Sequence, residues 1–419
     1  MRFSKSSSQT SLAPKRVCMI AYTRYRFDGR VRLEAESLVS WGYEVVFLVP
    51  KLEQDPKTYV LSGVTVQELN VGKYGGKNKL RYVFSYVTFL LLALIACTRL
   101  FVRSHISVIH VHNMPDVLVF AAIIPRLLGC QLVLDLHDTV PETYEAKFGK
   151  ISRLVLSLLR IEEKVCCALA HRVICVNHVQ RESVAQRGVP REKIATVITM
   201  PRYAAPPSSG VVRQDETVFR LVNHGTMSKR LGNDLIIEAA AKLVHEIPGF
   251  ELHIIGGGDN LEDMYSLCKS LDLENHVHFH KGVPWDQLGQ KLSIMDAGIV
   301  ANRVNVATDL MLPSKLIDYV VLGIPAIVPR LRAIQYYFSD EMVSYFEPEN
   351  VDSMIAATIA LYRDKARRER QVATARQFLH DNPWDDRASG LRGLYGELCK
   401  EAVPGPQSVR TDDAKSPGF

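Results

Sequence analysis

The alternation of short apolar runs with helix-length segments constrains the fold of this chain more than any other feature. The first run, VCMIAY at residues 17–22, has six successive apolar or small residues. Such a run is typical of a strand that is covered on both faces of a sheet. Similar runs alternate with predicted helices as far as residue 198, and the second half of the chain repeats the pattern. We therefore predict an α/β protein with parallel sheets.

The chain has 419 residues, which is too long for one typical core, so two domains are expected. The Pro- and Ser-rich segment PRYAAPPSSG marks the boundary between them. The predicted parts are a disordered tail (1–14), an N-terminal domain (15–200), a linker (201–214), a C-terminal domain (215–383), a helix (384–402) and a second disordered tail (403–419).

The charge of the chain is mildly positive, at +6 from 51 Lys and Arg against 45 Asp and Glu. A balance this small argues against a dedicated nucleic-acid binder, and it is compatible with an anionic substrate or an acidic membrane surface. The eight cysteines form no CxxC pair, and most lie in apolar runs, so we expect reduced core thiols and a cytoplasmic protein. No apolar stretch precedes Val17, so no secretory signal is expected.

The segment 82–98 is a run of seventeen residues without a charge. Basic residues flank it on both sides: Lys79, Arg81, Arg99 and Arg103. The length of this segment is borderline for a transmembrane helix. The predicted strands on either side belong to one sheet, which cannot lie on both sides of a bilayer. We therefore predict a helix that packs on the sheet and touches the inner face of the membrane with its outer side. A fully buried core helix is the alternative.

The stretch LPSKLIDYVVLGIPAIVP at residues 312–329 predicts a helix with a ligand at its N-terminus. Pro313 is suited to a helix start, and Gly323 ends the apolar repeat. Ser314 and Lys315 fall in the first turn, where free N–H groups favour an anion, and Asp318 follows one turn later. This pattern suits a diphosphate joined to a sugar, although an ordinary capped helix remains an alternative.

Other candidate residues lie where strands end, and ligands of open α/β sheets bind at these ends. In the C-terminal half they are glycine turns and basic residues: Gly225 with Lys229 and Arg230, and Gly256 to Gly258. In the N-terminal half they are Gly29 with Arg30, then Asn113, His137, Asp138 and Glu142. Each signal is weak alone, since Asp28 and Gly29 could form a simple turn and one polar residue could cap a helix.

Several other kinds of site lack support in the sequence. His276, His278 and His280 alternate along a predicted strand, but no carboxylate or cysteine completes a metal set, and Val277 and Phe279 form the core face. The chain has no GxSxG, HExxH or Walker motif, so hydrolase, zinc-protease and P-loop readings are not favoured.

Taken in order, the motifs resemble a known family. They are FDGRVRLEAESLVSWGYEV, HVHNMPD, LDLHDTVPE, HGTMSKRLGNDLIIEA, LHIIGGGDN, VHFHKGV and LPSKLIDYVVLGIPAIV. The chain resembles the retaining nucleotide-sugar glycosyltransferases of group 1 over residues 17–400. The resemblance implies the GT-B fold, in which two Rossmann-like domains face each other across a cleft. It also implies an N-terminal acceptor domain, a C-terminal donor domain, and a final helix that returns to the N-terminal domain.

The resemblance also implies roles for the candidate residues. Gly29 would meet the donor phosphates and His137 the transferred sugar, while Arg230 and Lys315 would bind the diphosphate. Asp318 would hold the ribose. The remaining residues would line the donor site (Gly225, Lys229, Gly256, Gly258, Val283, Pro313, Ser314) or the acceptor side (Arg30, Asn113, Asp138, Glu142). No metal or other cofactor is expected.

Two departures from the family pattern stand out. The first of two family glutamates falls on Leu310, with Asp309 beside it, and the second is Asp318. Leu231 follows Arg230 where many members have lysine, so Lys229 or Lys315 would supply the second cation.

The sequence thus predicts a retaining, metal-independent glycosyltransferase. It would move a sugar from a UDP- or GDP-linked donor to a lipid-linked or polysaccharide acceptor in surface-glycan assembly of the exopolysaccharide or lipopolysaccharide type. The alternatives are a non-catalytic GT-B scaffold in a membrane glycan-assembly complex, and a nucleotide-sugar epimerase or phosphorylase of the same fold.

Overall fold

The computed structural model describes residues 15–51, 56–72, 79–149, 151–198, 200–201, 217–381 and 388–399. Both predicted tails, nearly all of the predicted linker and the predicted start of the last helix at Trp384 lie outside these residues.

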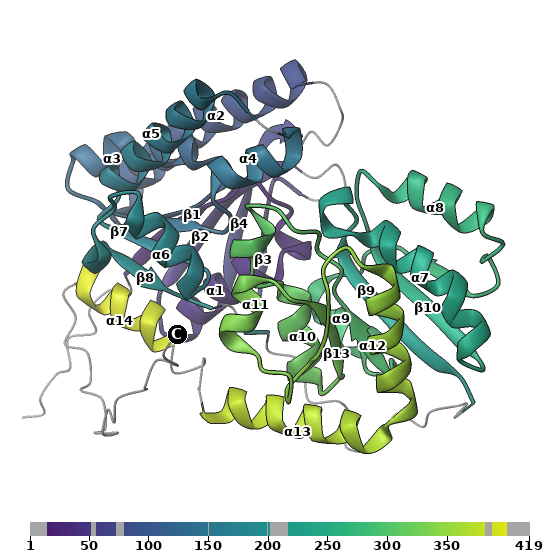
Figure 1. Ribbon diagram of the computed structural model, residues 1–419. Helices are drawn as coiled ribbons and strands as arrows, with labels where there is room; N and C mark the ends of the chain where they lie inside the picture. The colour runs from purple at the N-terminus through teal and green to yellow at the C-terminus, as the bar shows by residue number, and fades with distance from the viewer. Residues whose placement is uncertain are drawn as a thin grey trace, which may run out of the picture.

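The N-terminal sheet has eight strands in the order β3-β4-β2-β1-β5-β6-β7-β8 (Figure 1). Their bounds are β1 (Arg16–Ile20), β2 (Glu44–Lys51), β3 (Thr58–Leu61), β4 (Val64–Gly72), β5 (Ile106–His112), β6 (Gln131–Leu136), β7 (Arg172–Cys175) and β8 (Ile194–Thr196). All neighbours pair in parallel except β3 with β4. The parallel sheet was predicted. The short edge strand β3 was not, because its half-exposed residues lack a continuous apolar run.

Helices cover both faces of this sheet. One face carries α2 (Lys79–Ser104), the 3₁₀ helix η2 (Asp116–Ala122), α3 (Ile123–Leu127) and α5 (Arg153–Leu169), and the other carries α1 (Gly29–Ser40) and α14 (Ala388–Leu398). The remaining helices are η1 (Tyr25–Phe27), α4 (Val140–Phe148), α6 (His178–Gln186) and η3 (Arg191–Lys193). The sequence pattern predicts one helix from about residue 116 to residue 128. The structure instead has η2 followed by α3, with Pro125 inside α3.

The apolar segment 82–98 lies in α2, which packs on the sheet as predicted. Phe89, Ala93 and Cys97 are fully buried on one side, whereas Phe84 is 73% exposed on the other. The alternative of a fully buried helix is therefore wrong. Among the described residues, α2 is the one helix whose length and composition would suffice to cross a membrane, and only 28% of its most apolar window is buried.

The C-terminal sheet has six parallel strands in the order β11-β10-β9-β12-β13-β14. Its elements are β9 (Phe219–Thr226), η4 (Lys229–Leu231), α7 (Asn233–Glu246), β10 (Phe250–Gly257), α8 (Leu261–Ser270), β11 (Val277–His280), α9 (Trp285–Leu292), β12 (Ala297–Ile299), η5 (Thr308–Leu310), α10 (Ser314–Leu322), β13 (Ala326–Pro329), α11 (Arg332–Tyr337), β14 (Ser344–Phe346), α12 (Val351–Arg363) and α13 (Lys365–Asp381). The prediction of two parallel-sheet domains is confirmed.

The end of the chain returns to the N-terminal domain. α14 lies beside β8 in Figure 1. Its Tyr395 hydroxyl lies 2.9 Å from Nδ1 of His110, which is in β5. The C-terminal segment therefore joins the core of the first domain.

Candidate active site

A buried polar network surrounds Asp135 of β6. Its Oδ1 accepts a hydrogen bond of 2.6 Å from Nη2 of Arg30. Its Oδ2 lies 3.1 Å from Nδ1 of His112 and 3.2 Å from Nε2 of His137. His112 and Asp135 are register partners on adjacent strands, so the network lies at the carboxyl ends of β5 and β6. The structure thus brings together two predicted residues, Arg30 and His137.

Charge in this network is balanced. Burial tends to raise the pKa of Asp135, but the Arg30 guanidinium and the histidine N–H groups hold it well below its ordinary value. Burial, reinforced by the charge of Asp135, raises the pKa of Glu34 well above its usual range. Burial also lowers the pKa of His110 and His112. The network therefore favours the charged forms of Arg30 and Asp135 and the neutral forms of Glu34, His110 and His112.

Glu34, His110, His112 and Asp135 are the one group of described residues with the composition of a metal site. One ligand atom from each lies within 4.8 Å of the others. However, Arg30 already neutralises Asp135 and also lies 3.4 Å from Glu34. A divalent cation would add uncompensated positive charge to a buried site, so the residues fit a hydrogen-bond network better than a metal centre.

Asn113 fixes the loop that carries His137. Its Nδ2 donates to Oδ1 of Asp116 at 2.7 Å and to the backbone oxygen of Asp138 at 2.6 Å. Its Oδ1 accepts from the backbone N–H of His137 at 2.8 Å. Asn113 thus orients the loop after β6, and Asp138 contributes to this arrangement through its carbonyl group.

Glu142 is held within the N-terminal domain. Its Oε1 accepts a hydrogen bond of 2.7 Å from Arg187, which also bonds to both carboxylate oxygens of buried Glu163. These contacts join the start of α4 to α5 and to the end of α6. We expect Glu142 to act here mainly as a packing partner.

In the C-terminal domain, the start of α10 gathers a second polar cluster. Nζ of Lys315 lies 3.4 Å from Oδ1 of Asn223, and the residue is only 7% exposed. Burial lowers the pKa of Lys315 to about 8, and the charge of Asp318 partly offsets the effect. Oδ2 of Asp318 lies 3.4 Å from Nε2 of His224, whose pKa burial and Lys315 lower to about 3. A buried lysine that keeps its proton at neutral pH is suited to bind an anion.

Three of the predicted glycines let the turns after β9 and β10 approach each other. A Cβ on Gly256 would collide with the carbonyl group of Gly225, and one on Gly258 would collide with that of Met227. Gly225 also has φ of +98°, and the Lys315 side chain passes beside it. Backbone packing therefore requires small residues here, whether or not a ligand is bound.

The other predicted donor residues lie on the same edge of this sheet. Lys229 and Arg230 are in η4, directly after β9, and Nη1 of Arg230 is buried without a hydrogen-bond partner among the described residues. Pro313 precedes α10, and Ser314 is its exposed first residue. Val283 lies half-buried in the loop after β11.

The two domains meet at Gly29 and at Leu310. A Cβ on Gly29 would collide with the ring of Trp285 in α9, so in this structure the indole covers the position predicted to meet phosphate. Leu310 is buried against Val179 of the N-terminal domain. Its carbonyl group accepts a hydrogen bond of 2.9 Å from Asn177. The position at which the resemblance leads us to expect a glutamate is therefore an apolar domain contact.

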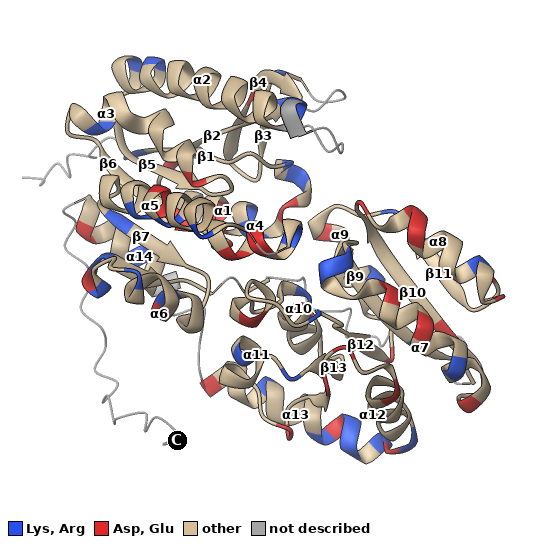
Figure 2. Ribbon diagram, turned by 45° about the horizontal axis from the view of Figure 1, so that its top comes forward, with Lys and Arg blue, Asp and Glu red and all other residues tan. Residues whose placement is uncertain are grey.

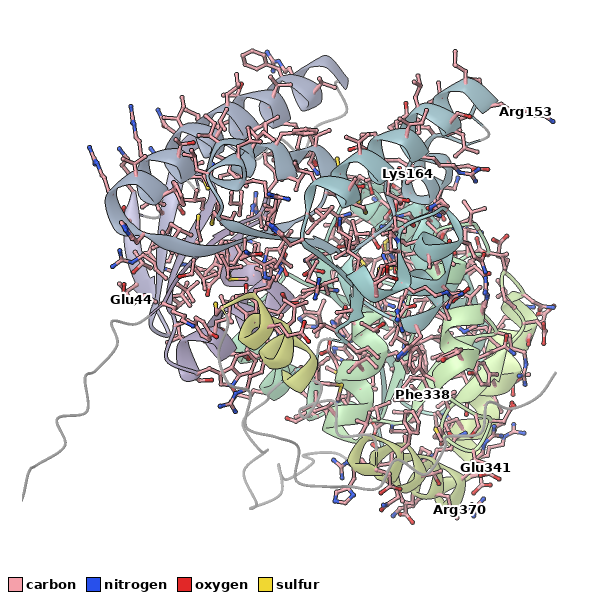
Figure 3. The ribbon with its side chains drawn as sticks, turned by 90° about the vertical axis from the view of Figure 1, so that its left-hand side faces the viewer. Glu44, Arg153, Lys164, Phe338, Glu341 and Arg370 are labelled. Atoms are coloured by element: carbon pink, nitrogen blue, oxygen red, sulfur yellow. The ribbon has the colours of Figure 1, made fainter. Side chains whose placement is uncertain are left out.

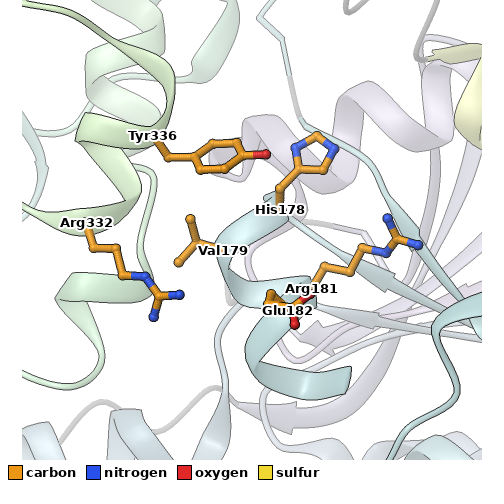
Figure 4. Close-up of a pocket in the computed structure, with 6 residues that line it drawn as sticks. All are labelled: His178, Val179, Arg181, Glu182, Arg332 and Tyr336. Carbon is orange, nitrogen blue, oxygen red and sulfur yellow. The ribbon is translucent and has the colours of Figure 1, made fainter. Parts of the chain in front are cut away.

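A cavity of ≈ 270 Å³ lies between α6 and α11 (Figure 4). It is lined by residues of both domains: His178, Val179, Arg181, Glu182, Arg332 and Tyr336. None of these is a predicted site residue. The cavity is separate from the clusters around Asp135 and Lys315.

Four residues of these two clusters were not predicted from the sequence: Asp135, His112, Asn223 and His224. Each interrupts an otherwise apolar strand with a polar side chain, and that interruption was the available signal. Only the fold shows that these polar side chains face the predicted ones.

Comparisons with known proteins agree with this architecture. Residues 29–198 match the family model described as a glycosyl transferase 4-like domain, and residues 208–378 match glycosyl transferases group 1. A GDP-mannose-dependent alpha-(1-6)-phosphatidylinositol monomannoside mannosyltransferase of Mycolicibacterium smegmatis is 26% identical over 167 residues. That match spans 39% of this chain and 43% of the length of that relative.

Solved structures share the fold at low sequence identity. Sucrose-phosphate synthase from Thermosynechococcus elongatus has a TM-score of 0.74 at 17% identity, over 92% of this chain and 99% of that one. Anabaena Alr3699/HepE in complex with UDP and glucose has a TM-score of 0.68 at 14% identity, over 92% of this chain and 100% of that one.

Proposed function

Because the chain belongs to the group 1 glycosyltransferases and has their GT-B fold, we propose that it is a retaining glycosyltransferase that needs no metal. It takes a sugar from a UDP- or GDP-linked donor and transfers it to a lipid-linked or polysaccharide acceptor in surface-glycan assembly. The observation that carries this proposal is the buried Lys315 at the start of α10, whose side chain passes beside Gly225 in the turn after β9. Arg230 follows that turn in η4. This arrangement suits an anion such as a diphosphate.

In the proposed reaction, Arg230, Lys315 and the N-terminus of α10 stabilise the departing diphosphate. The bond between the anomeric carbon and the diphosphate oxygen breaks, and the acceptor oxygen bonds to that carbon on the same face. The proton of the acceptor hydroxyl moves to the diphosphate. His137 contacts the sugar, and Asp318 holds the ribose.

The descriptions of two similar proteins support a nucleotide-sugar donor. The mycobacterial relative is GDP-mannose-dependent, and the Anabaena protein was crystallised with UDP and glucose. They differ in the nucleotide, so we propose the donor as either UDP- or GDP-linked.

Substitution of Arg230 tests the catalytic assignment. Arg230→Ala should raise the barrier to turnover by about 2–4 kcal/mol, because it removes a cation from the departing diphosphate. Arg363→Ala, on the exposed outer side of α12, is the matched control. Initial rates with a cognate donor give the comparison, and equal rates for both variants would remove Arg230 from this role.

Leu310 favours a second candidate, a non-catalytic scaffold, because it replaces an expected glutamate with a domain contact. A scaffold has no need to bind a donor. A thermal-shift series with UDP, GDP and ADP separates the candidates, since stabilisation by a nucleoside diphosphate supports the enzyme and none supports the scaffold.

We further propose that the protein is cytoplasmic and attaches peripherally to the inner face of the membrane. On α2, the exposed residues Phe84, Leu91, Ile95 and Val102 are spaced to form one stripe. On α5, Leu154, Leu158, Ile161 and Val165 form another. The core contacts of these helices lie on one face of the N-terminal sheet, with η2 and α3 between them.

Charges beside the two stripes match an anionic bilayer. α2 has no acidic residue (Figure 2). Its Arg81, Arg99 and Arg103 are exposed. On α5, exposed Arg153, Arg160 and Lys164 flank the apolar stripe; Figure 3 shows Arg153 at the outer end of this helix. Of the two acidic residues of α5, Glu163 is buried and Glu162 is half-buried, where it accepts a hydrogen bond from Cys166. Apolar ridges with basic flanks are typical of interfacial helices.

Liposome sedimentation tests the membrane proposal. Wild-type protein should pellet with vesicles that contain phosphatidylglycerol, and the double variant Leu91→Glu/Leu158→Glu should pellet much less. Val60→Glu, on the exposed edge strand β3, controls for the added charge. Equal pelleting of the double variant and the control would refute this surface. A dimer that the double variant abolishes would instead assign the surface to self-association.

A further inference from the structure

The cavity between α6 and α11 is lined by rings and charged side chains that come from both domains. Figure 4 shows the rings of His178 and Tyr336 on one side of it and Arg332 and Glu182 on the other, with Val179 between them. The ring centroids of His178 and Tyr336 are 5.8 Å apart. Tyr336 is 60% exposed, so its ring is accessible to a ligand in the cavity.

Contacts between the domains hold the walls of this cavity in place. The hydroxyl of Tyr337 accepts a hydrogen bond of 2.8 Å from the backbone N–H of His178 and lies 2.7 Å from its Nδ1. Asn177, the preceding residue, donates a hydrogen bond of 2.9 Å to the carbonyl group of Leu310. Val179 is buried against the same leucine. A ligand that enters a cavity with fixed walls binds more tightly, because less freedom is lost on binding.

The polar groups of the lining carry both signs of charge. Arg332 is exposed, and none of the residues that the structure describes bonds to its guanidinium. Glu182 bonds to Gln186 and Arg191 through Oε1, which leaves Oε2 without a partner in the described part of the chain. Nε of Arg181 is buried and also lacks a partner there. The lining can therefore both donate hydrogen bonds to a ligand and accept them from it.

The size and the lining of the cavity select a class of ligand. Its volume of ≈ 270 Å³ lies just below the range of about 300–1,000 Å³ that is typical of sites for drug-sized ligands, so it suits one sugar ring better than a whole nucleotide sugar. A lone anion would meet the carboxylate of Glu182. A pyranose ring can instead place its apolar C–H face on Tyr336 and Val179, while its hydroxyls bond to Arg332 and Glu182.

We propose that this cavity binds one pyranose unit of a glycan acceptor, at a distance from the unit that receives the transferred sugar. The cavity is separate from the clusters around Asp135 and Lys315, so the bound unit does not itself react. That the glycan is an acceptor rests on the proposed function, whereas the binding of a sugar ring does not. Because the lining comes from both domains, a bound sugar should also favour the arrangement in which α6 and α11 lie together.

Saturation-transfer NMR of the full chain tests sugar binding without a donor. The probes are methyl α-glucopyranoside, methyl α-mannopyranoside, methyl α-galactopyranoside and N-acetylglucosamine. At least one of them should receive saturation from the wild type, and Tyr336→Ala and Arg332→Ala should each raise its Kd about tenfold, because each variant loses a contact with the ring. Both side chains are exposed, so the variants should fold.

Two exposed residues outside the cavity provide matched controls. Tyr265→Ala, on α8, and Arg363→Ala, on α12, should leave the Kd unchanged. No saturation of any probe, or the same Kd in the cavity variants and the wild type, overturns the proposal. Displacement of the bound glycoside by inorganic phosphate at equal concentration also overturns it, because the cavity would then be an anion site.

Kinetics with a reacting acceptor separate this proposal from the proposed function. Tyr336→Ala and Arg332→Ala should each raise the acceptor KM about tenfold, with the donor KM changed less than twofold. An unchanged acceptor KM in both variants overturns the acceptor role of the cavity, even where transfer itself confirms the proposed function. If a probe binds in the cavity but no donor reacts, the proposed function fails and the sugar site stands.

Discussion

At the scale of single residues, the protein keeps two buried ionisable clusters that a purely structural core would not need. Lys315 carries a pKa of about 8 because it is withdrawn from water, and Asp135 stays charged through Arg30. Burying such groups costs free energy. Their retention at the carboxyl ends of strands is what a binding site requires.

The pH dependence of activity should report Lys315. Because kcat/KM reflects the free enzyme, it should fall above pH 8 as the lysine loses the proton that attracts the diphosphate. Lys315→Arg keeps its charge and should remove this alkaline limb, although its absolute rate can differ. An alkaline limb that persists in Lys315→Arg would assign it to another group.

Stability should change with pH in the opposite sense. An unfolded lysine holds its proton up to about pH 10.4, whereas folded Lys315 releases it near 8. Between these values the unfolded state binds more protons, so the free energy of unfolding should rise with pH. Denaturant titrations of the wild type and of Lys315→Met at pH 7.5 and 9.5 measure this contribution. The free energy of unfolding should rise more between these pH values in the wild type than in Lys315→Met.

Local sequence patterns indicate some residues of the two clusters but not others. Lys315, Asp318 and His137 could be proposed as site residues from local patterns, because His137 directly follows an apolar strand and the other two lie at the start of a helix. Asp135 and Asn223 could not be assigned, because their partners Arg30 and Lys315 lie 105 and 92 residues away along the chain. The contact of Trp285 with Gly29 depends on how the domains pack, which no local pattern encodes.

At the scale of elements, α2 combines an apolar core side with an apolar outer side. Its composition alone resembles a transmembrane helix, but it lies between β4 and β5 of a single sheet. Because the strands before and after α2 belong to one sheet, the sequence predicts that this helix packs on the sheet. The sequence also predicts helices from about residue 352 to residue 379, and the structure has α12 and α13 there, which meet at Asp364.

Two phenylalanines of α2 test its packing. Phe89→Ala should lower the free energy of unfolding by about 3–5 kcal/mol, because it opens a cavity in the core. Phe84→Ala, at a side chain that is 73% exposed, should change it by less than about 0.5 kcal/mol. Urea titrations provide the values, and equal losses at both positions would contradict the observed orientation of α2.

At the scale of the whole molecule, two parallel-sheet domains present different chemistry to each other. The N-terminal domain offers a histidine that lies beside a buried carboxylate, and the C-terminal domain offers a helix start with a buried lysine. Leu310 and Trp285 lie in the contacts between the domains. Both domains could be predicted from the sequence, but the contacts that Leu310 and Trp285 make between them could not.

The most direct test of the proposed function is a panel of UDP-, GDP- and ADP-linked sugars. The panel is incubated with the full-length protein and a detergent-solubilised lipid acceptor mixture and followed by mass spectrometry. We expect a UDP- or GDP-linked donor to release its nucleoside diphosphate as the sugar appears on an acceptor with retained configuration, and we expect Lys315→Ala to abolish this transfer. Intact donors throughout the panel, together with no stabilisation of the protein by any nucleoside diphosphate, would contradict it.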